Sequence, residues 1–259
     1  MAAPVERIER DLAALGEAIA ILVTEFHSSY FSYLTSLGQA AQQQLILASY
    51  HICTQGYPDS FLHLSFAQRQ QLQKALRGMA GQVQEQLLSH LQTPTLTDTE
   101  NVTDDVPTLE LKNPEHLAEW QENLEQAIAQ TLSTLSRNTN RLIQQAGILP
   151  PQLPEALLEA AAQAEASTDG VAGPPNLLNL LIQAENSEDS EETAVTHIIA
   201  LNLRLSEIEF ADSTVMAFRK QIRNLLLRLS TLKREYQKKQ RERTIAEAEA
   251  AWRTSWFED

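Results

Sequence analysis

The chain has 259 residues, with 20 Lys and Arg against 34 Asp and Glu, so its formal net charge is −14 at pH 7. A hydrophobic content of 43% excludes a wholly disordered chain, and the length allows one large core or two small ones. Only 8 Gly and 10 Pro occur in a background rich in Leu, Ala, Gln and Glu, which disfavours sandwiches, barrels and doubly wound sheets. The composition predicts an all-α fold, a bundle of long helices.

The sequence contains none of the residue patterns typical of metal sites or of phosphate-binding loops. Helical metal sites need ligands three or four residues apart, and the histidines do not meet this spacing; they are His27, His51, His63, His90, His116 and His197. The nearest approaches to a glycine-rich phosphate loop, at residues 78–81 and 170–173, lack a Gly-Lys-Ser/Thr sequence. We therefore expect no cofactor and no metal.

Cys53 is the only cysteine, which rules out a disulfide within the chain. His51 is two residues away and would lie on a different helical face, so we interpret Cys53 as a small buried residue and not as a nucleophile. The sequence therefore predicts a protein that is not an enzyme and has no catalytic residue.

The amino-terminal residues lack the basic and apolar regions of a secretory signal. The most apolar stretch, 19–23, is bracketed by Glu17 and Glu25, so no 18 apolar residues run unbroken. We expect a cytoplasmic protein without a membrane-spanning helix; peripheral association with a membrane stays open.

The first region, 1–92, is predicted to be helical. Six apolar residues spaced alternately four and three apart predict a long helix over 4–37; they are Ile8, Leu12, Leu15, Ile19, Leu22 and Phe26. A second helix is predicted over 42–54, ending at the turn 56–59. Ser65 followed by Gln68 forms a capping box that opens a third helix, with an apolar stripe of Leu72, Leu76, Met79, Val83, Leu87 and Leu91.

Residues 93–112 are rich in Thr, Asp, Glu and Pro and predict an acidic flexible linker. The carboxy-terminal helical region, 113–259, opens with a helix capped by Asn113 and ended by Gly147. Short helices are predicted over 154–166 and after Pro175, and a solvated loop over 185–192. Residues 198–210 fit both a strand and a helix, and we predict a helix because a lone strand has no evident partner.

A coiled-coil seam of three heptads lies within a predicted helix over 208–243. Its residues alternate in steps of three and four: Val215, Phe218, Ile222, Leu225, Leu229, Leu232 and Tyr236. Asp212 and Ser213 could instead begin a new helix there. Two interpretations stay open, the core of a bundle within one chain and a self-association surface between two copies that would form a homodimer.

The same helix is basic, with ten Lys and Arg against two Glu over 218–246. The possible polyanion contacts are Arg219, Arg223, Lys233, Arg234, Lys238, Lys239, Arg241 and Arg243. These residues either form a solvated face opposite the protein's own acidic loops or bind nucleic acid or an anionic membrane surface. We favour the first, because no base-reading pattern accompanies the charges.

Three aromatic residues, Trp252, Trp256 and Phe257, fall in the last eight positions. The two tryptophans are four apart and share one helical face. We interpret this tail as an anchor, either folded back on the bundle or docked into a pocket of a partner.

Three segments resemble a family of uncharacterised helical proteins from cyanobacteria. They are His51-Ile52-Cys53-Thr54-Gln55-Gly56-Tyr57-Pro58, Gly173-Pro174-Pro175-Asn176-Leu177-Leu178 and Ala246-Glu247-Ala248-Glu249-Ala250-Ala251-Trp252. The resemblance implies a cyanobacterial cytoplasm or thylakoid surface as the setting and carries over no activity and no site residue. From the residues themselves we expect a scaffold or adaptor that binds an unidentified protein through helical packing; the alternative is a polyanion-binding module using 219–243.

Overall fold

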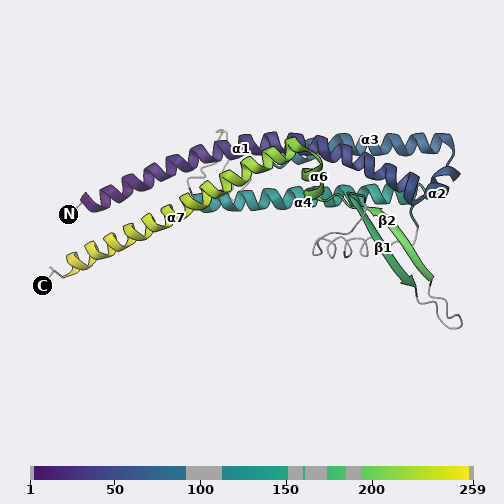
Figure 1. Ribbon diagram of the computed structural model, residues 1–259. Coiled ribbons are helices and arrows are strands. Elements are labelled where there is room, and N and C mark those ends of the chain that lie inside the picture. Colours follow the sequence, from purple (N-terminus) through teal and green to yellow (C-terminus); the bar gives the residue numbers. More distant parts are fainter. Residues whose placement is uncertain (1–2, 92–112, 151–159, 161–173, 185–193, 257–259) are drawn as a thin grey trace, which may run out of the picture. The chain divides into compact units, whose positions relative to one another are not determined.

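The computed structural model describes residues 3–91, 113–150, 160, 174–184 and 194–256, and most of them are helical (Figure 1). The all-α prediction is confirmed, with one small two-stranded hairpin in addition. The chain forms two compact units. Unit 1 comprises 1–33, 91–126 and 217–259, and unit 2 comprises 34–90 and 127–216. The predicted linker over 93–112, the loop over 185–192 and all but residue 160 of the helix over 154–166 lie outside the described residues.

The helix α1 extends from Ala3 to His51 without a break. The two helices predicted over 4–37 and 42–54 are therefore one, because residues 38–41 contain no proline and include two alanines, which favour helix. A π-helical turn, η1 (Ile52–Gly56), ends it at the predicted turn, and the short helix α2 (Pro58–His63) follows.

By length and composition alone, α1 can cross a membrane: the span Val5–Gly56 contains an 18-residue window with a mean hydropathy of 1.2. The core helix of a soluble protein passes the same test. The expectation that the protein lacks a membrane-spanning helix therefore stays a prediction.

In unit 2, α1 packs against α3 (Phe66–Ser89). The predicted capping box opens α3: the Gln68 N–H donates to Ser65 Oγ at 3.3 Å, and the Ser65 N–H donates to Gln68 Oε1 at 2.8 Å. The buried residues of α3 are Leu72, Leu76, Ala80, Val83 and Leu87. They follow the predicted stripe, with Ala80 more deeply buried than its neighbour Met79.

Gly38 marks the closest approach of α1 to α3. A Cβ atom at Gly38 would lie 2.6 Å from the Cα atom of Gln84, so Gly38→Ala forces backbone to move. We expect a net loss of about 1–3 kcal/mol in unfolding free energy, because the overpacking outweighs the gain in helix propensity. Gly78→Ala on the open side of α3 is the matched control, and urea unfolding followed by circular dichroism should show it slightly stabilised. Equal stabilisation of both variants would contradict the close contact.

The helix α4 extends from Pro114 to Gln145. Its start is capped as predicted, since the Glu115 N–H donates to Asn113 Oδ1 at 3.0 Å. Gly147 follows with a φ of +81°, a left-handed conformation that suits glycine after a helix. Both predicted ends of this helix are confirmed.

Residues 177–201 contain an antiparallel hairpin in unit 2, β1 (Leu177–Ala184) and β2 (Ala194–Leu201), with Leu177 opposite Leu201. The helices predicted after Pro175 and from residue 198 are therefore wrong over these residues. The strand at 198–201 does have a partner, and helix begins only at α6 (Leu205–Ala211).

Polar side chains of α4 hold the base of this hairpin. The Asn140 side chain donates to the Leu201 carbonyl and accepts from the Leu201 N–H, both at 2.8 Å. Ser136 Oγ accepts from the Leu203 N–H at 2.9 Å. These bonds satisfy backbone groups at the end of β2 and just after it that β1 does not reach.

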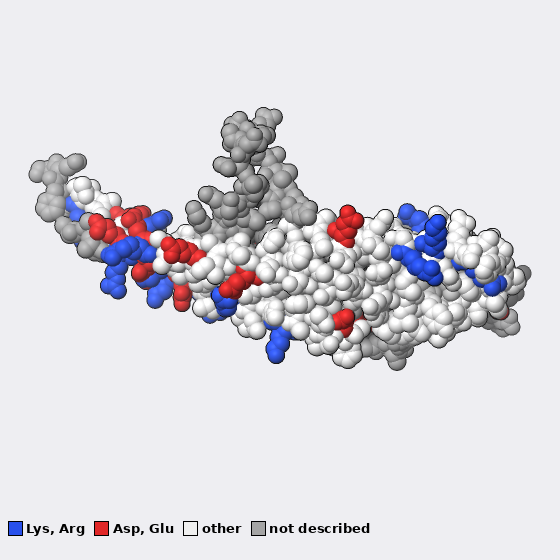
Figure 2. Space-filling view, turned by 90° about the horizontal axis from the view of Figure 1, so that it is seen from above, with Lys and Arg blue, Asp and Glu red and all other residues white. Residues whose placement is uncertain are grey.

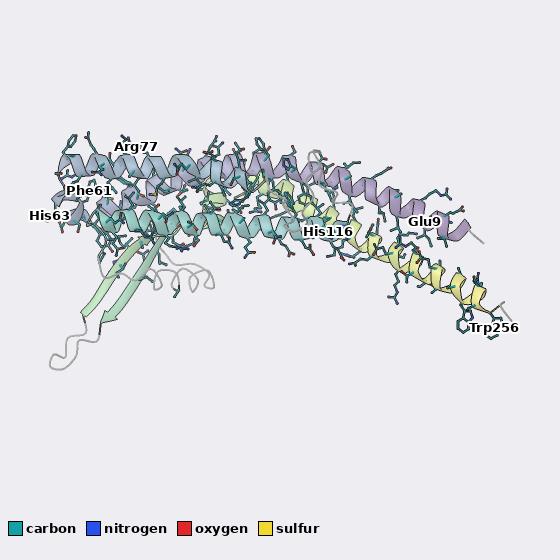
Figure 3. All side chains as sticks on the ribbon, turned by 180° about the vertical axis from the view of Figure 1, so that it is seen from behind. Glu9, Phe61, His63, Arg77, His116 and Trp256 are labelled. Carbon is teal, nitrogen blue, oxygen red and sulfur yellow. The ribbon has the colours of Figure 1, made fainter. Side chains whose placement is uncertain are left out.

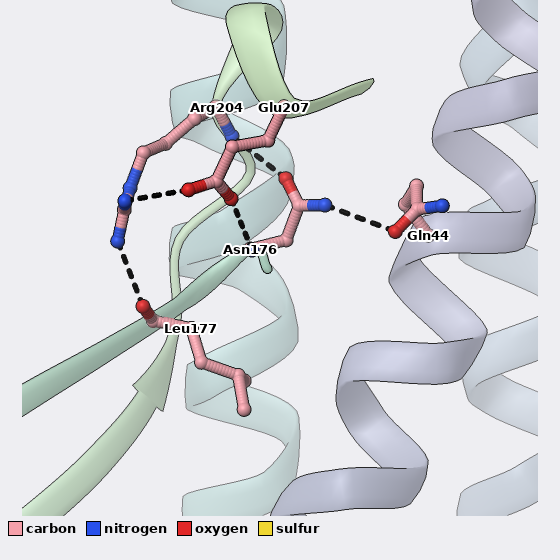
Figure 4. A network of polar contacts seen from close by, with 5 residues as sticks. All are labelled: Gln44, Asn176, Leu177, Arg204 and Glu207. Carbon is pink, nitrogen blue, oxygen red and sulfur yellow. Dashed lines mark hydrogen bonds and ion pairs between the residues drawn. The ribbon is translucent and has the colours of Figure 1, made fainter. Parts of the chain in front are cut away.

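Asn176, which precedes β1, is the centre of a second polar network (Figure 4). Its backbone is left-handed, with a φ of 60°, and it is fully buried. Its amide donates to Gln44 Oε1 at 3.0 Å and accepts from the Arg204 N–H at 3.0 Å, and its own N–H donates to Glu207. Arg204 completes the network by ion pairing with Glu207 at 2.7 Å.

The last helix, α7 (Ser213–Ser255), begins after Asp212, whose Oδ1 accepts from the N–H groups of Thr214 and Val215. The heptad helix predicted over 208–243 therefore begins at 213, and the alternative of a new cap at Asp212 is the observed one.

Unit 1 combines the first part of α1, the first part of α4 and most of α7. Asp11 pairs with Lys239 and Glu25 with Arg228, so α7 is antiparallel to α1. The hydrogen bond from Gln237 to Glu115 and the ion pair of Arg219 with Glu125 show the same for α4. As a result α1 begins and α7 ends at the same end of unit 1 (Figure 1).

Candidate functional site

The heptad seam lies largely inside the chain. Val215, Ile222, Leu225 and Leu229 are buried within a single copy, and Phe218, Leu232 and Tyr236 are half-buried. Val215 belongs to unit 2 and the others to unit 1. The deeply buried positions are already covered by the chain itself, so a second copy can reach only what the half-buried ones leave exposed.

A part-buried ion pair lies beside the seam in unit 1. The Arg219 guanidinium bonds both carboxylate oxygens of Glu125, at 2.5 and 3.0 Å, and also donates to the Tyr33 hydroxyl at 2.6 Å. The Tyr30 hydroxyl donates to Glu125 Oε1 at 2.6 Å, and burial followed by the Glu125 charge raises the Tyr30 pKa. This network connects α1, α4 and α7 and engages Arg219 internally.

The other predicted polyanion contacts divide into two sets. Lys239 pairs with Asp11 and Glu242, both at 3.0 Å, and Arg243 lies 3.4 Å from Glu247. Five of the predicted contacts have no ion pair within the described part of the chain: Arg223, Lys233, Arg234, Lys238 and Arg241. Figure 2 shows basic and acidic side chains interspersed along this part of unit 1. The surface is therefore mixed in sign.

The tryptophans of the tail are exposed on the last turns of α7. Trp252 is 67% and Trp256 72% exposed, and their ring centroids lie 5.8 Å apart. Ile245 on the same helix is 51% exposed. Figure 3 shows Trp256 at the end of α7, away from the other helices of unit 1. Trp252 and Trp256 do not fold back onto the helices of unit 1, and Phe257 lies outside the described residues.

The exposure of the tail follows from the helical register. At 100° per residue, Trp252 lies roughly 160° around the helix from Tyr236, the last seam residue. Ile245 and Trp256 fall within about 40° of Trp252 by the same count. These three residues, hereafter the indole face, point away from the side of α7 that forms the core.

Comparison with known protein families, with curated proteins and with solved structures finds no match. The cyanobacterial resemblance rests on the quoted residues alone.

Cys53 lies in the π-helical turn η1 and is buried. Burial raises the pKa of its thiol to about 11, so the thiol is protonated at neutral pH and unsuited to nucleophilic attack. Over the described part of the chain, no group of three or more His, Cys, Asp and Glu residues could hold a metal ion.

The sequence did not indicate a pocket in unit 2, which lies where α1, η1, α2 and α3 meet and has a volume of about 310 Å³. Its residues come from separate elements, so no local motif encodes it. A π-helical turn is the one local feature there that often accompanies functional sites, and its sequence, Ile-Cys-Thr-Gln-Gly, has no recognisable signature.

Proposed function

We propose that the protein is a non-enzymatic adaptor or scaffold that binds a protein partner through the indole face of α7. The observation that carries the proposal is the pair of adjacent tryptophan rings exposed on a regular helix. Large exposed apolar groups are costly in water and typically mark a binding surface. Tryptophan is also enriched among the residues that dominate binding energy at protein interfaces.

The spacing of the indole face indicates how a partner would bind. Residues 245, 252 and 256 lie on one side of a helix, as do the anchors of helices that bind in hydrophobic grooves. The seam is separate from this surface, so binding need not open unit 1. The partner we expect is a cytoplasmic protein with an apolar groove.

Replacing both tryptophans by alanine tests the proposal. Each interface tryptophan of this type contributes about 2 kcal/mol or more, a factor of about 30, so the double variant should bind the partner about 1000-fold more weakly if the two effects add. The melting temperature should stay within about 1 °C, since neither ring packs in the core. The measurement compares proteins that co-purify with the full chain, followed by a binding titration with the recovered partner.

Phe66→Ala is the matched control, because Phe66 is an equally exposed aromatic residue on α3, in unit 2. It should leave partner binding unchanged. If the double variant keeps all partners, or if it melts much earlier, the tail is not a docking surface.

A polyanion-binding role is the second candidate. It is favoured by five cations that have no ion pair within the part of the chain that the structure describes: Arg223, Lys233, Arg234, Lys238 and Arg241. Binding to phosphates weakens steeply as salt rises, whereas apolar docking barely responds. The binding titration with the recovered partner is therefore repeated at about 50 to about 500 mM salt, a range that brackets physiological ionic strength. A steep loss of affinity indicates phosphate binding, and a nearly constant affinity indicates apolar docking.

A further inference from the structure

The unit 2 pocket has apolar walls. Its lining includes Ile46, Tyr50, Cys53, Phe61, Leu72 and Leu76, and no acidic side chain of the described residues takes part. The π-helical turn contributes Cys53, whose thiol is neutral, so the wall formed by η1 carries no charge. An apolar, uncharged interior favours an aliphatic or aromatic group over a polar one.

The wall formed by α2 is held in place. The Arg69 guanidinium lies 5.5 Å from the centroid of the Phe61 ring and donates to the Leu62 carbonyl at 2.7 Å. Phe61 is therefore fixed between its own helix and α3. A wall of this kind can accept a ligand without first reorganising.

One charged side chain, Arg77, lines the pocket. It is exposed and has no ion-pair partner among the described residues. Figure 3 shows Arg77 on α3 and Phe61 on α2, and Figure 2 shows Lys and Arg side chains over the end of unit 2 formed by α2 and the start of α3. The pocket therefore joins an apolar interior to a cationic rim.

Uncharged surface continues beyond the pocket along α1. Residues 26–58 contain no Lys, Arg, Asp or Glu, so the part of α1 in unit 2 and η1 offer no carboxylate to Arg77. Ser49, which also lines the pocket, has a buried Oγ without a hydrogen-bond partner in the described part of the chain. A donor or acceptor on a ligand would satisfy it.

We propose that this pocket binds an amphiphile with one apolar chain and one anionic head group, such as a long-chain carboxylate or the acyl chain and head of an anionic lipid. The chain lies among Phe61, Leu72 and Leu76, and the head group pairs with Arg77. The pocket is in unit 2 and the inference is independent of the indole face.

Dodecanoate, below its micellar concentration, is the probe, and Cys53 supplies the readout because it is the only cysteine and lines the pocket. Alkylation by iodoacetamide near pH 9 is followed by mass spectrometry. We expect dodecanoate to slow alkylation of the full chain at least about fivefold, and equilibrium dialysis to give a saturable site with one ligand per chain.

Arg77→Glu and Lys74→Glu form a matched pair of charge reversals at exposed positions three residues apart on α3, of which only Arg77 lines the pocket. Arg77→Glu should weaken dodecanoate binding about tenfold or more, and Lys74→Glu less than about threefold. Equal losses in both variants, or protection by uncharged dodecanol as strong as by dodecanoate, would overturn the assignment of the head group to Arg77.

In a second arm of the experiment, vesicles of phosphatidylglycerol replace dodecanoate as the probe, and alkylation of Cys53 is again the readout. Protection of Cys53 by dodecanoate alone identifies a soluble carboxylate as the ligand, and protection by vesicles identifies a lipid; either result supports an anionic amphiphile. Unchanged alkylation in both arms, with no saturable binding in dialysis, overturns the proposal.

Discussion

Replacing Leu225 and Leu229 together by aspartate is expected to unfold unit 1. Both side chains are buried in α7, at 8% and 3% exposure. Each substitution forfeits about 1.5–3 kcal/mol of apolar burial and places a carboxylate in a site without a partner. The combined loss of about 5–10 kcal/mol matches the whole stability of a typical domain. Circular dichroism should show that the double variant has lost helix already at the zero-urea point of the titration.

Leu227→Asp is the control on the same helix, since Leu227 is exposed. We expect it to change the unfolding free energy by less than about 0.5 kcal/mol. Light scattering behind a sizing column adds the oligomeric state. A dimeric wild type and a well-folded monomeric double variant would contradict this expectation and make the seam an interface between copies.

Replacing Asn176 by alanine should lower the stability of unit 2 by about 3–4 kcal/mol. The substitution removes the amide that bonds Gln44 and the Arg204 N–H, and both partners are part-buried, so each loses a bond without full access to water. Alanine also strains the left-handed backbone at this position. Chemical unfolding, with hydrogen exchange of the β2 amides, is the measurement.

Asn176→Gly separates the two contributions, because glycine accepts the φ of 60° but lacks the amide. It should be less destabilising than alanine by about 1 kcal/mol. Asn138→Ala, at an exposed position of α4, should be nearly neutral. If alanine and glycine at 176 both behave like this control, the network in Figure 4 does not hold the hairpin.

Local signals predicted the helix ends well. The capping box at Ser65, the cap at Asn113 and the glycine at 147 act over a few residues, so the sequence alone contains the whole interaction. The hairpin was missed for the opposite reason. Its strand at 198–201 depends on β1 and on Asn140, which is 61 residues from Leu201 in the chain, and no local pattern reveals such partners.

The candidate sites divide in the same way. The positions of Trp252 and Trp256 relative to the seam follow from counting residues along one helix, so their exposure could be derived from the sequence. The engagement of Arg219 by Glu125 could not, because it depends on how α4 lies beside α7. The unit 2 pocket requires four elements at once, and its one cation, Arg77, looks in the sequence like any exposed arginine of a helix.

Unit 1 is built from segments that are far apart in the chain, and this constrains the order in which the protein folds during synthesis. Its three segments are 1–33, 91–126 and 217–259, so the contacts between α1 and α7 join residues about two hundred positions apart. During synthesis, the apolar residues of the first part of α1, Ile19, Leu22 and Phe26, are made long before α7. All residues of unit 2 are made before residue 217. Unit 2 can therefore fold first. The nascent chain meanwhile displays apolar surface of α1 that α7 later covers, the kind of surface that chaperones recognise.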